Sequence, residues 1–165
     1  MRKSDKSIHN ISIASIKRST MKPYDFKWTK FYESNIDFPY QGLSLNLIED
    51  ELIICSTLID GENYSILTTQ KFVTVENGKE RAESLSGATD KGYGDFKGYK
   101  EDQVTFGLVE LENGNELKYF IETGKASMIM IHGVRTLIRT QKMTNQNVEN
   151  VTRVWNRQNE KNKNC

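Results

Sequence analysis

The sequence predicts a mostly β, α+β fold in which seven short antiparallel strands precede one amphipathic helix. Three observations support this prediction. Apolar and polar residues alternate through much of 43–121, which is the period of a half-buried strand. Asn-Gly pairs at 77–78 and 113–114 indicate tight hairpins, because a type I′ turn needs positive φ at both central positions. After residue 124 the apolar period becomes helical.

Length and charge limit the class of protein. A chain of 165 residues fits one domain and is long enough to bury a core. Its 23 lysines and arginines nearly balance 22 aspartates and glutamates, so the basic excess of a general nucleic-acid binder is missing. No secretory signal and no run of about 18 apolar residues is present. We therefore expect a cytoplasmic location.

Residues 1–41 are interpreted as an extension in two parts. The first, 1–23, is basic, and its isoleucines match neither the strand nor the helix period. We expect a loosely ordered arm, with a segment that contacts a partner or a membrane surface as the alternative. In the second part, Trp28, Phe31 and Tyr32 have the spacing of one helical face. This spacing predicts a short helix whose aromatic side chains cover the main body, or form an exposed groove.

The strands follow from Gly42 onward, separated by turn residues. The predicted strands are 43–47, 52–58, 64–69, 72–75, 82–87, 104–111 and 117–123. The charged run 49–51 is interpreted as a solvated turn, and the hairpin at 104–123 has the clearest pattern. These strands belong to a predicted domain at 42–143.

A helix over 124–142 completes that domain. Its apolar stripe must be buried, and the open end of a bent sheet is the expected place. The stripe consists of Met130, Ile131, Val134, Leu137 and Ile138. Gly133 would allow this helix to approach the sheet closely. The remaining residues, 144–165, are interpreted as a polar tail in which Trp155 docks a short final helix.

This order of elements resembles the pleckstrin-homology (PH) superfold. Residues 63–75, NYSILTTQKFVTV, resemble the third and fourth strands of bacterial PH-like domains. Residues 106–121 resemble their sixth and seventh strands, and 126–138 the capping helix. The resemblance covers roughly 42–140 and implies a seven-stranded barrel or sandwich capped by the helix. This superfold hosts lipid, peptide and protein binders, so the resemblance leaves the function open.

Catalytic and metal-binding patterns are scarce. The chain has two histidines, His9 and His132, and two cysteines, of which Cys55 lies in an apolar strand. No HExxH or CxxC spacing occurs, so a zinc site is not expected. An apolar strand is a poor place for a reactive thiolate. We expect no enzyme activity, no metal and no cofactor.

A glycine-rich stretch at 86–102, SGATDKGYGDFKGYKED, is the candidate binding site. Its glycines match no Walker pattern and lead into a strand instead of a helix, which argues against a phosphate site. Its charges sum to −1, which disfavours phosphoinositides. Aromatic anchors among flexible polar residues are typical of protein-recognition loops. The candidate contacts are Tyr93, Asp95, Phe96, Lys97 and Tyr99, and the alternative is that the aromatics cover the barrel edge.

The sequence thus favours a non-catalytic protein-binding module. The most specific hypothesis is an immunity protein that inhibits a cognate bacterial toxin encoded by an adjacent gene. A peripheral membrane module that binds lipid is the alternative. The bias toward Lys, Asn and Ile suits an AT-rich bacterial genome.

Overall fold

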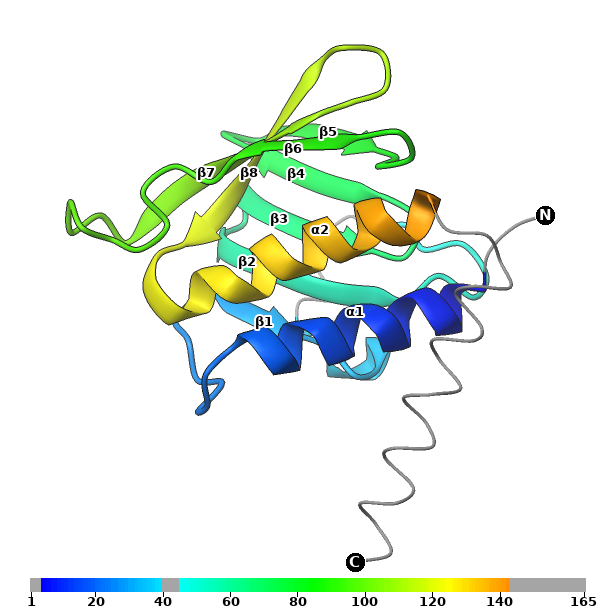
Figure 1. Cartoon of the computed structure of the whole chain (residues 1–165), viewed down its shortest axis with the longest axis horizontal. Coiled ribbons are helices and arrows are strands. Elements are labelled where there is room, and N and C mark those ends of the chain that lie inside the picture. The colour runs from blue at the N-terminus through cyan, green and yellow to red at the C-terminus, as the bar shows by residue number, and fades with distance from the viewer. Residues whose placement is uncertain (1–3, 40–44, 143–165) are drawn as a thin grey trace, which may run out of the picture.

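A computed structural model describes residues 4–39 and 45–142, and these form an α+β fold (Figure 1). The strands are β1 (Thr29–Phe31), β2 (Ile53–Asp60), β3 (Asn63–Thr68), β4 (Phe72–Glu76), β5 (Lys79–Glu83), β6 (Thr89–Gly92), β7 (Val104–Glu110) and β8 (Glu116–Glu122). The helices are α1 (Asp5–Ser19) and α2 (Ser127–Lys142), with short 3-10 helices at Asn35–Asp37 and Gly124–Ala126. The predicted α+β class is confirmed.

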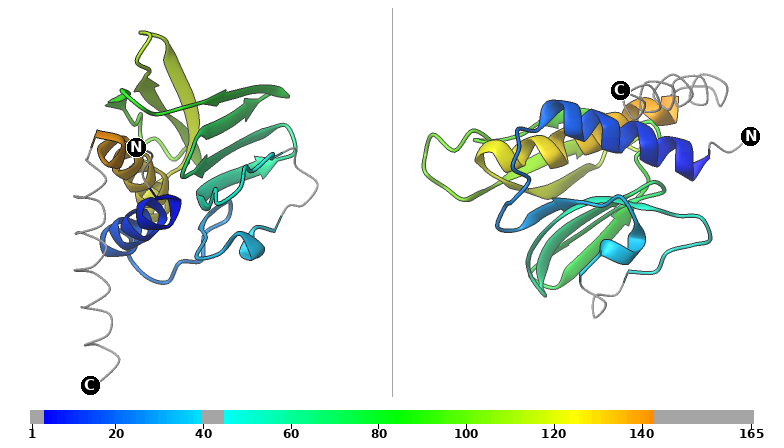
Figure 2. Two further views of the ribbon diagram at one scale, coloured as in Figure 1. Left: turned by 90° about the vertical axis from the view of Figure 1, so that its right-hand side faces the viewer. Right: turned by 90° about the horizontal axis from the view of Figure 1, so that it is seen from below.

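The strands form two antiparallel sheets, with no closed barrel among the described residues. One sheet has the order β1-β2-β3-β4-β5 and the other β6-β7-β8. The prediction was a seven-stranded barrel or sandwich, and the barrel alternative is wrong, because the eight described strands form two open sheets. Both helices lie on the same side of the sheets (Figure 2). The predicted C-terminal helix is confirmed.

The N-terminal arm is helical, which corrects the expectation of loose order. Ser4 caps α1 by accepting a hydrogen bond from the Ser7 backbone N–H. The buried face includes Ile8, Ile11 and Ile16, and two small serines complete its helical period. Those serines are Ser12 and Ser15. α1 packs against α2, so residues assigned to an extension contribute to the main core.

The predicted helix around residue 28 is wrong, because this segment forms the edge strand β1. Thr29 pairs with Thr57 and Phe31 pairs with Cys55 of β2. The Thr29 and Thr57 hydroxyls are 2.9 Å apart. Pairing with β2 thus outweighs the helical spacing of the aromatics. Of the predicted strand 43–47, residues 45–47 form no strand, and the others lie outside the described residues.

The hairpins follow the predicted turn chemistry. Asn77 and Gly78 have φ of 53° and 79°, which is the conformation that a type I′ turn requires. The resulting strand β5 starts earlier than the predicted strand 82–87. β6 lies inside the glycine-rich stretch and pairs with β7, so the free connection is shorter than expected. The predicted tail 144–165 lies outside the described residues.

Two apolar clusters lie on opposite faces of the larger sheet. The main cluster lies beneath the helices and includes Cys55, Leu67 and Phe72. The second includes Ile66 and Val73, and the segment after β1 covers it with partly buried side chains. Those side chains are Phe38, Leu45 and Leu47. The helices and this covering segment bury the two faces of the sheet.

Candidate functional site

The connection between β6 and β7, residues 93–103, is anchored at the start of the C-terminal helix, and we name it the Tyr99 loop. It projects at the left of Figure 1. The Gly124 N–H donates to the Phe96 carbonyl at 2.7 Å, and the Thr123 N–H donates to the Gln103 carbonyl at 3.0 Å. Backbone bonds from residues 123–124 therefore hold both ends of the loop.

Asp95 determines the internal shape of the loop. Its carboxylate accepts the Tyr99 N–H at 3.2 Å and the Lys100 N–H at 2.8 Å. Gly94 has a φ of 56°, and a Cβ there would lie 2.3 Å from the Thr105 hydroxyl. The glycine at position 94 thus serves the backbone of an ordered turn.

The predicted aromatic trio separates into two environments. Tyr93 and Phe96 are half-buried against the main core, with ring centroids 6.1 Å apart in an edge-to-face contact. Tyr99 is 80% exposed. The Lys97 ammonium lies 5.9 Å from the Phe96 ring centroid, and Lys97 is exposed. Two of the aromatics therefore cover the core, as one alternative predicted, while the role of the exposed Tyr99 in partner contact stays a prediction.

A polar cluster lies next to Tyr93, at the start of the loop. Arg135 of α2 lies 3.7 Å from the Asp90 carboxylate of β6. Burial and then Asp90 raise the pKa of Tyr93 to about 12. Burial also raises the pKa of Tyr119, whose hydroxyl has no hydrogen-bond partner among the described residues. Both phenols stay protonated at neutral pH, so this cluster offers no phenolate nucleophile.

His9 and Cys55 are both buried. His9 is buried in α1, where its Nε2–H donates to the Tyr32 carbonyl at 2.8 Å. Cys55 is fully buried, which raises the pKa of its thiol. Among residues 4–39 and 45–142, no three His, Cys, Asp or Glu side chains could hold a metal ion. Neither described helix is long and apolar enough to span a membrane.

The histidine environments predict a pH dependence of stability. Burial lowers the pKa of both His9 and His132 below the ordinary 6.5. The unfolded chain then binds more protons near pH 6, so histidine-linked stability is full above 6.5 and decreases as the pH falls below it. We expect the free energy of unfolding to decrease from about pH 7.5 to about pH 5.5, measured in urea. A His9→Gln/His132→Gln variant should show a flatter profile, and an unchanged slope would contradict this assignment.

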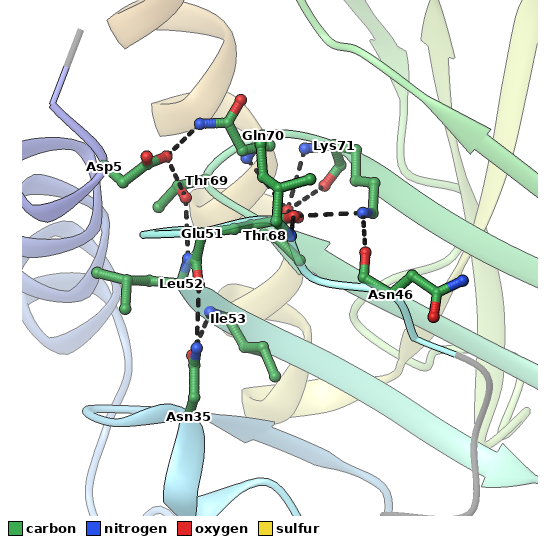
Figure 3. Close-up of polar contacts among 11 residues, drawn as sticks. Asp5, Asn35, Asn46, Glu51, Leu52, Ile53, Thr68, Thr69, Gln70 and Lys71 are labelled. Atoms are coloured by element: carbon green, nitrogen blue, oxygen red, sulfur yellow. Dashed lines mark hydrogen bonds and ion pairs between the residues drawn. The ribbon is translucent and has the colours of Figure 1, made fainter.

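A cavity of about 700 Å³ opens beside the N-terminus of α1. It is lined by Ser4, Asp5, Lys6, His9, Asn10, Glu33, Asp50 and Leu52. Next to it, Asp5 accepts hydrogen bonds from the Thr69 hydroxyl at 2.7 Å and from the Gln70 amide, and Leu52 donates to Thr69 at 3.1 Å (Figure 3). The contacts of Asp5 join α1 to the end of β3, so they are structural.

Glu51 is the second carboxylate of this network. The predicted solvated turn at 49–51 is confirmed for Glu49 and Asp50, which are exposed, and is wrong for Glu51, which is buried. Glu51 is 2% exposed, and its carboxylate contacts the Thr68 hydroxyl and the Lys71 ammonium (Figure 3). The Ile48 N–H also donates to this carboxylate. Sequence reasoning missed the cavity and its network because it treated α1 as an arm. The signal was present, since Ile8, Ile11, Ser12, Ser15 and Ile16 follow the helical period when serines are allowed on the buried face.

Comparison of the chain with protein-family models, with curated proteins and with solved structures finds no match. The functional conclusion therefore depends on the geometry of the chain itself.

Proposed function

We propose that this protein is a non-catalytic protein-binding module whose contact surface is centred on Tyr99. The observation that carries the proposal is an 80% exposed tyrosine held on an ordered loop. Tyrosine is enriched at binding hot spots, because it offers a large amphipathic surface with little conformational entropy to lose. The carboxylate of Asp95 orders the loop before binding, which reduces the entropy cost of association.

The class of partner follows from the same loop. Lys97 and Lys100 are exposed beside Tyr99, and so are Glu101 and Asp102. A mixed-charge rim around an aromatic centre is typical of protein interfaces. A small binding module of this kind is suited to inhibit another protein by covering its surface. We infer that it acts as an immunity protein toward a bacterial toxin, and that its fold is a variant of the PH-like superfold with open sheets.

The test is binding to the purified product of the adjacent gene. Tyr99→Ala should weaken that complex about 30-fold, which corresponds to about 2 kcal/mol, since truncation removes a central aromatic anchor. Isothermal titration calorimetry measures both affinities. Ile36→Ala is the matched control, because Ile36 is 91% exposed and lies on a different segment.

Two outcomes would contradict the proposal. Equal losses for Tyr99→Ala and Ile36→Ala would show that the Tyr99 loop is not the contact surface. An adjacent gene product that neither binds this protein nor is toxic when expressed alone would remove the immunity assignment.

A further inference from the structure

The two helices concentrate the positive charge of the molecule. α1 and α2 contain six lysines and arginines and one carboxylate, Asp5. The totals of 23 and 22 leave 17 cations and 21 carboxylates for the rest of the chain. The helices therefore carry a net +5 and the rest −4, although the whole chain is nearly neutral. Asp5 is buried and bonded to β3–β4 residues, so it does not offset the outward charges.

Three arginines lie close together on the outward face of this helix pair. Arg135 and Arg139 are four residues apart on α2 and both are exposed, as is Arg18 in the last turn of α1. The pKa of His132 is lowered mainly by burial. The positive charge of each of the three arginines lowers it further. Asp90 lies 3.7 Å from Arg135, but no ion pair joins Arg139 to a described residue. Several positive side chains on one face favour an anionic partner over a neutral or cationic one.

This basic face borders the Tyr99 loop. The bonds from residues 123–124 to Phe96 and Gln103 hold the loop against the 3-10 helix that leads into α2. Lys125 is exposed in that 3-10 helix, which directly precedes α2 in the chain. Figure 1 shows the loop and the start of α2 at the same end of the molecule. One partner surface could therefore contact both.

We propose that the outward face of the helix pair, through Arg18, Arg135 and Arg139, extends the Tyr99 surface and binds a carboxylate-rich region of the same protein partner. This inference rests on the proposed function and adds the chemistry of the partner. Guanidinium groups suit it, because they bind carboxylates in a bidentate geometry.

A lipid surface or a nucleic acid fits this face less well. The described residues of α1 and α2 expose no large apolar side chain that could insert into a bilayer. Glu101 and Asp102 project beside Tyr99, and a uniformly anionic membrane or phosphate backbone would repel them. A protein can place its carboxylates opposite the arginines and other groups opposite the loop, so it matches both signs of charge.

The test uses a labelled poly-L-glutamate of about 20 residues at about 50 mM salt, with fluorescence anisotropy as the readout. We expect Arg135→Glu/Arg139→Glu to weaken binding at least about tenfold. Lys30→Glu/Lys79→Glu makes the same change in charge at exposed positions on β1 and β5, and should alter affinity less than about twofold. Circular dichroism verifies that both variants remain folded.

Rival ligands are measured at the same salt concentration, as a DNA duplex and as vesicles of phosphatidylcholine with about 30% phosphatidylserine. No binding of polyglutamate, equal losses for the two double variants, or tighter binding of DNA or vesicles would overturn the inference. Polyglutamate offers no pocket for an aromatic side chain, so its affinity reports on the arginines and not on the Tyr99 contact. A failure of the Tyr99 contact therefore appears only with the adjacent gene product, and a failure of the helix face only with polyglutamate.

Discussion

Replacing Gly107 with alanine is expected to lower the free energy of unfolding by about 3 kcal/mol, the upper range for overpacking a core. Gly107 of β7 pairs with Tyr119 of β8. A Cβ at Gly107 would lie 2.1 Å from Cζ of the Tyr119 ring. That ring is fully buried and contacts Phe72, with centroids 5.0 Å apart, so it has little room to move away. Denaturation in urea measures the change.

Gly92→Ala is the matched control for this substitution. Gly92 also lies in a strand, β6, but a Cβ there would meet no atom within 4 Å and its φ is not positive. We expect it to change stability by less than about 0.5 kcal/mol. The ring clash also predicts that Gly107→Ala costs much less in a Tyr119→Ala background. A Gly107→Ala protein as stable as the Gly92→Ala protein would show that the ring is free to shift.

Local turn chemistry explains which strands could be predicted from the sequence. The Asn77-Gly78 pair needs no distant contact to form its turn, so the β4–β5 hairpin follows from a few neighbouring residues. The helix α2 was equally accessible, because its apolar stripe is continuous. The predicted close approach at Gly133 is confirmed, since a Cβ there would lie 2.8 Å from the Cys55 sulfur.

Distant contacts explain the errors. Thr29–Phe31 become a strand only because β2 offers them an edge, and the aromatic spacing around them equally suits a helix. α1 is stabilised by packing against α2 more than by its own composition, and its buried serines conceal the apolar face. The resemblance to PH-like domains stays a prediction.

The candidate site shows the same division between what neighbouring residues determine and what distant contacts determine. The sequence placed the aromatics of the Tyr99 loop correctly in one segment, but only the fold separates the half-buried Tyr93 and Phe96 from the exposed Tyr99. The basic helix face was hidden because the overall charge is only +1. The positive charge of the helices and the negative charge of the rest of the chain become visible once α1 and α2 are assigned to one layer.

Glu51→Ala is expected to lower the free energy of unfolding by about 3 kcal/mol, the usual cost of breaking a buried charged network. Its carboxylate accepts the Ile48 N–H at 3.0 Å and the Thr68 hydroxyl at 2.5 Å, and it lies 3.3 Å from the Lys71 ammonium. Alanine would leave these donors without their acceptor and would leave a cavity where the carboxylate lay. Urea denaturation at neutral pH measures the loss.

Two further variants test why Glu51 matters. Glu49→Ala removes an exposed carboxylate from the same turn and should cost less than about 0.5 kcal/mol. Glu51→Gln keeps the size and one acceptor oxygen but loses the charge beside Lys71, so its cost should lie between the two alanine variants. Equal stability of Glu51→Ala and Glu49→Ala would show that the turn is held by its backbone alone. A glutamine variant as unstable as Glu51→Ala would instead assign the whole effect to the ion pair with Lys71.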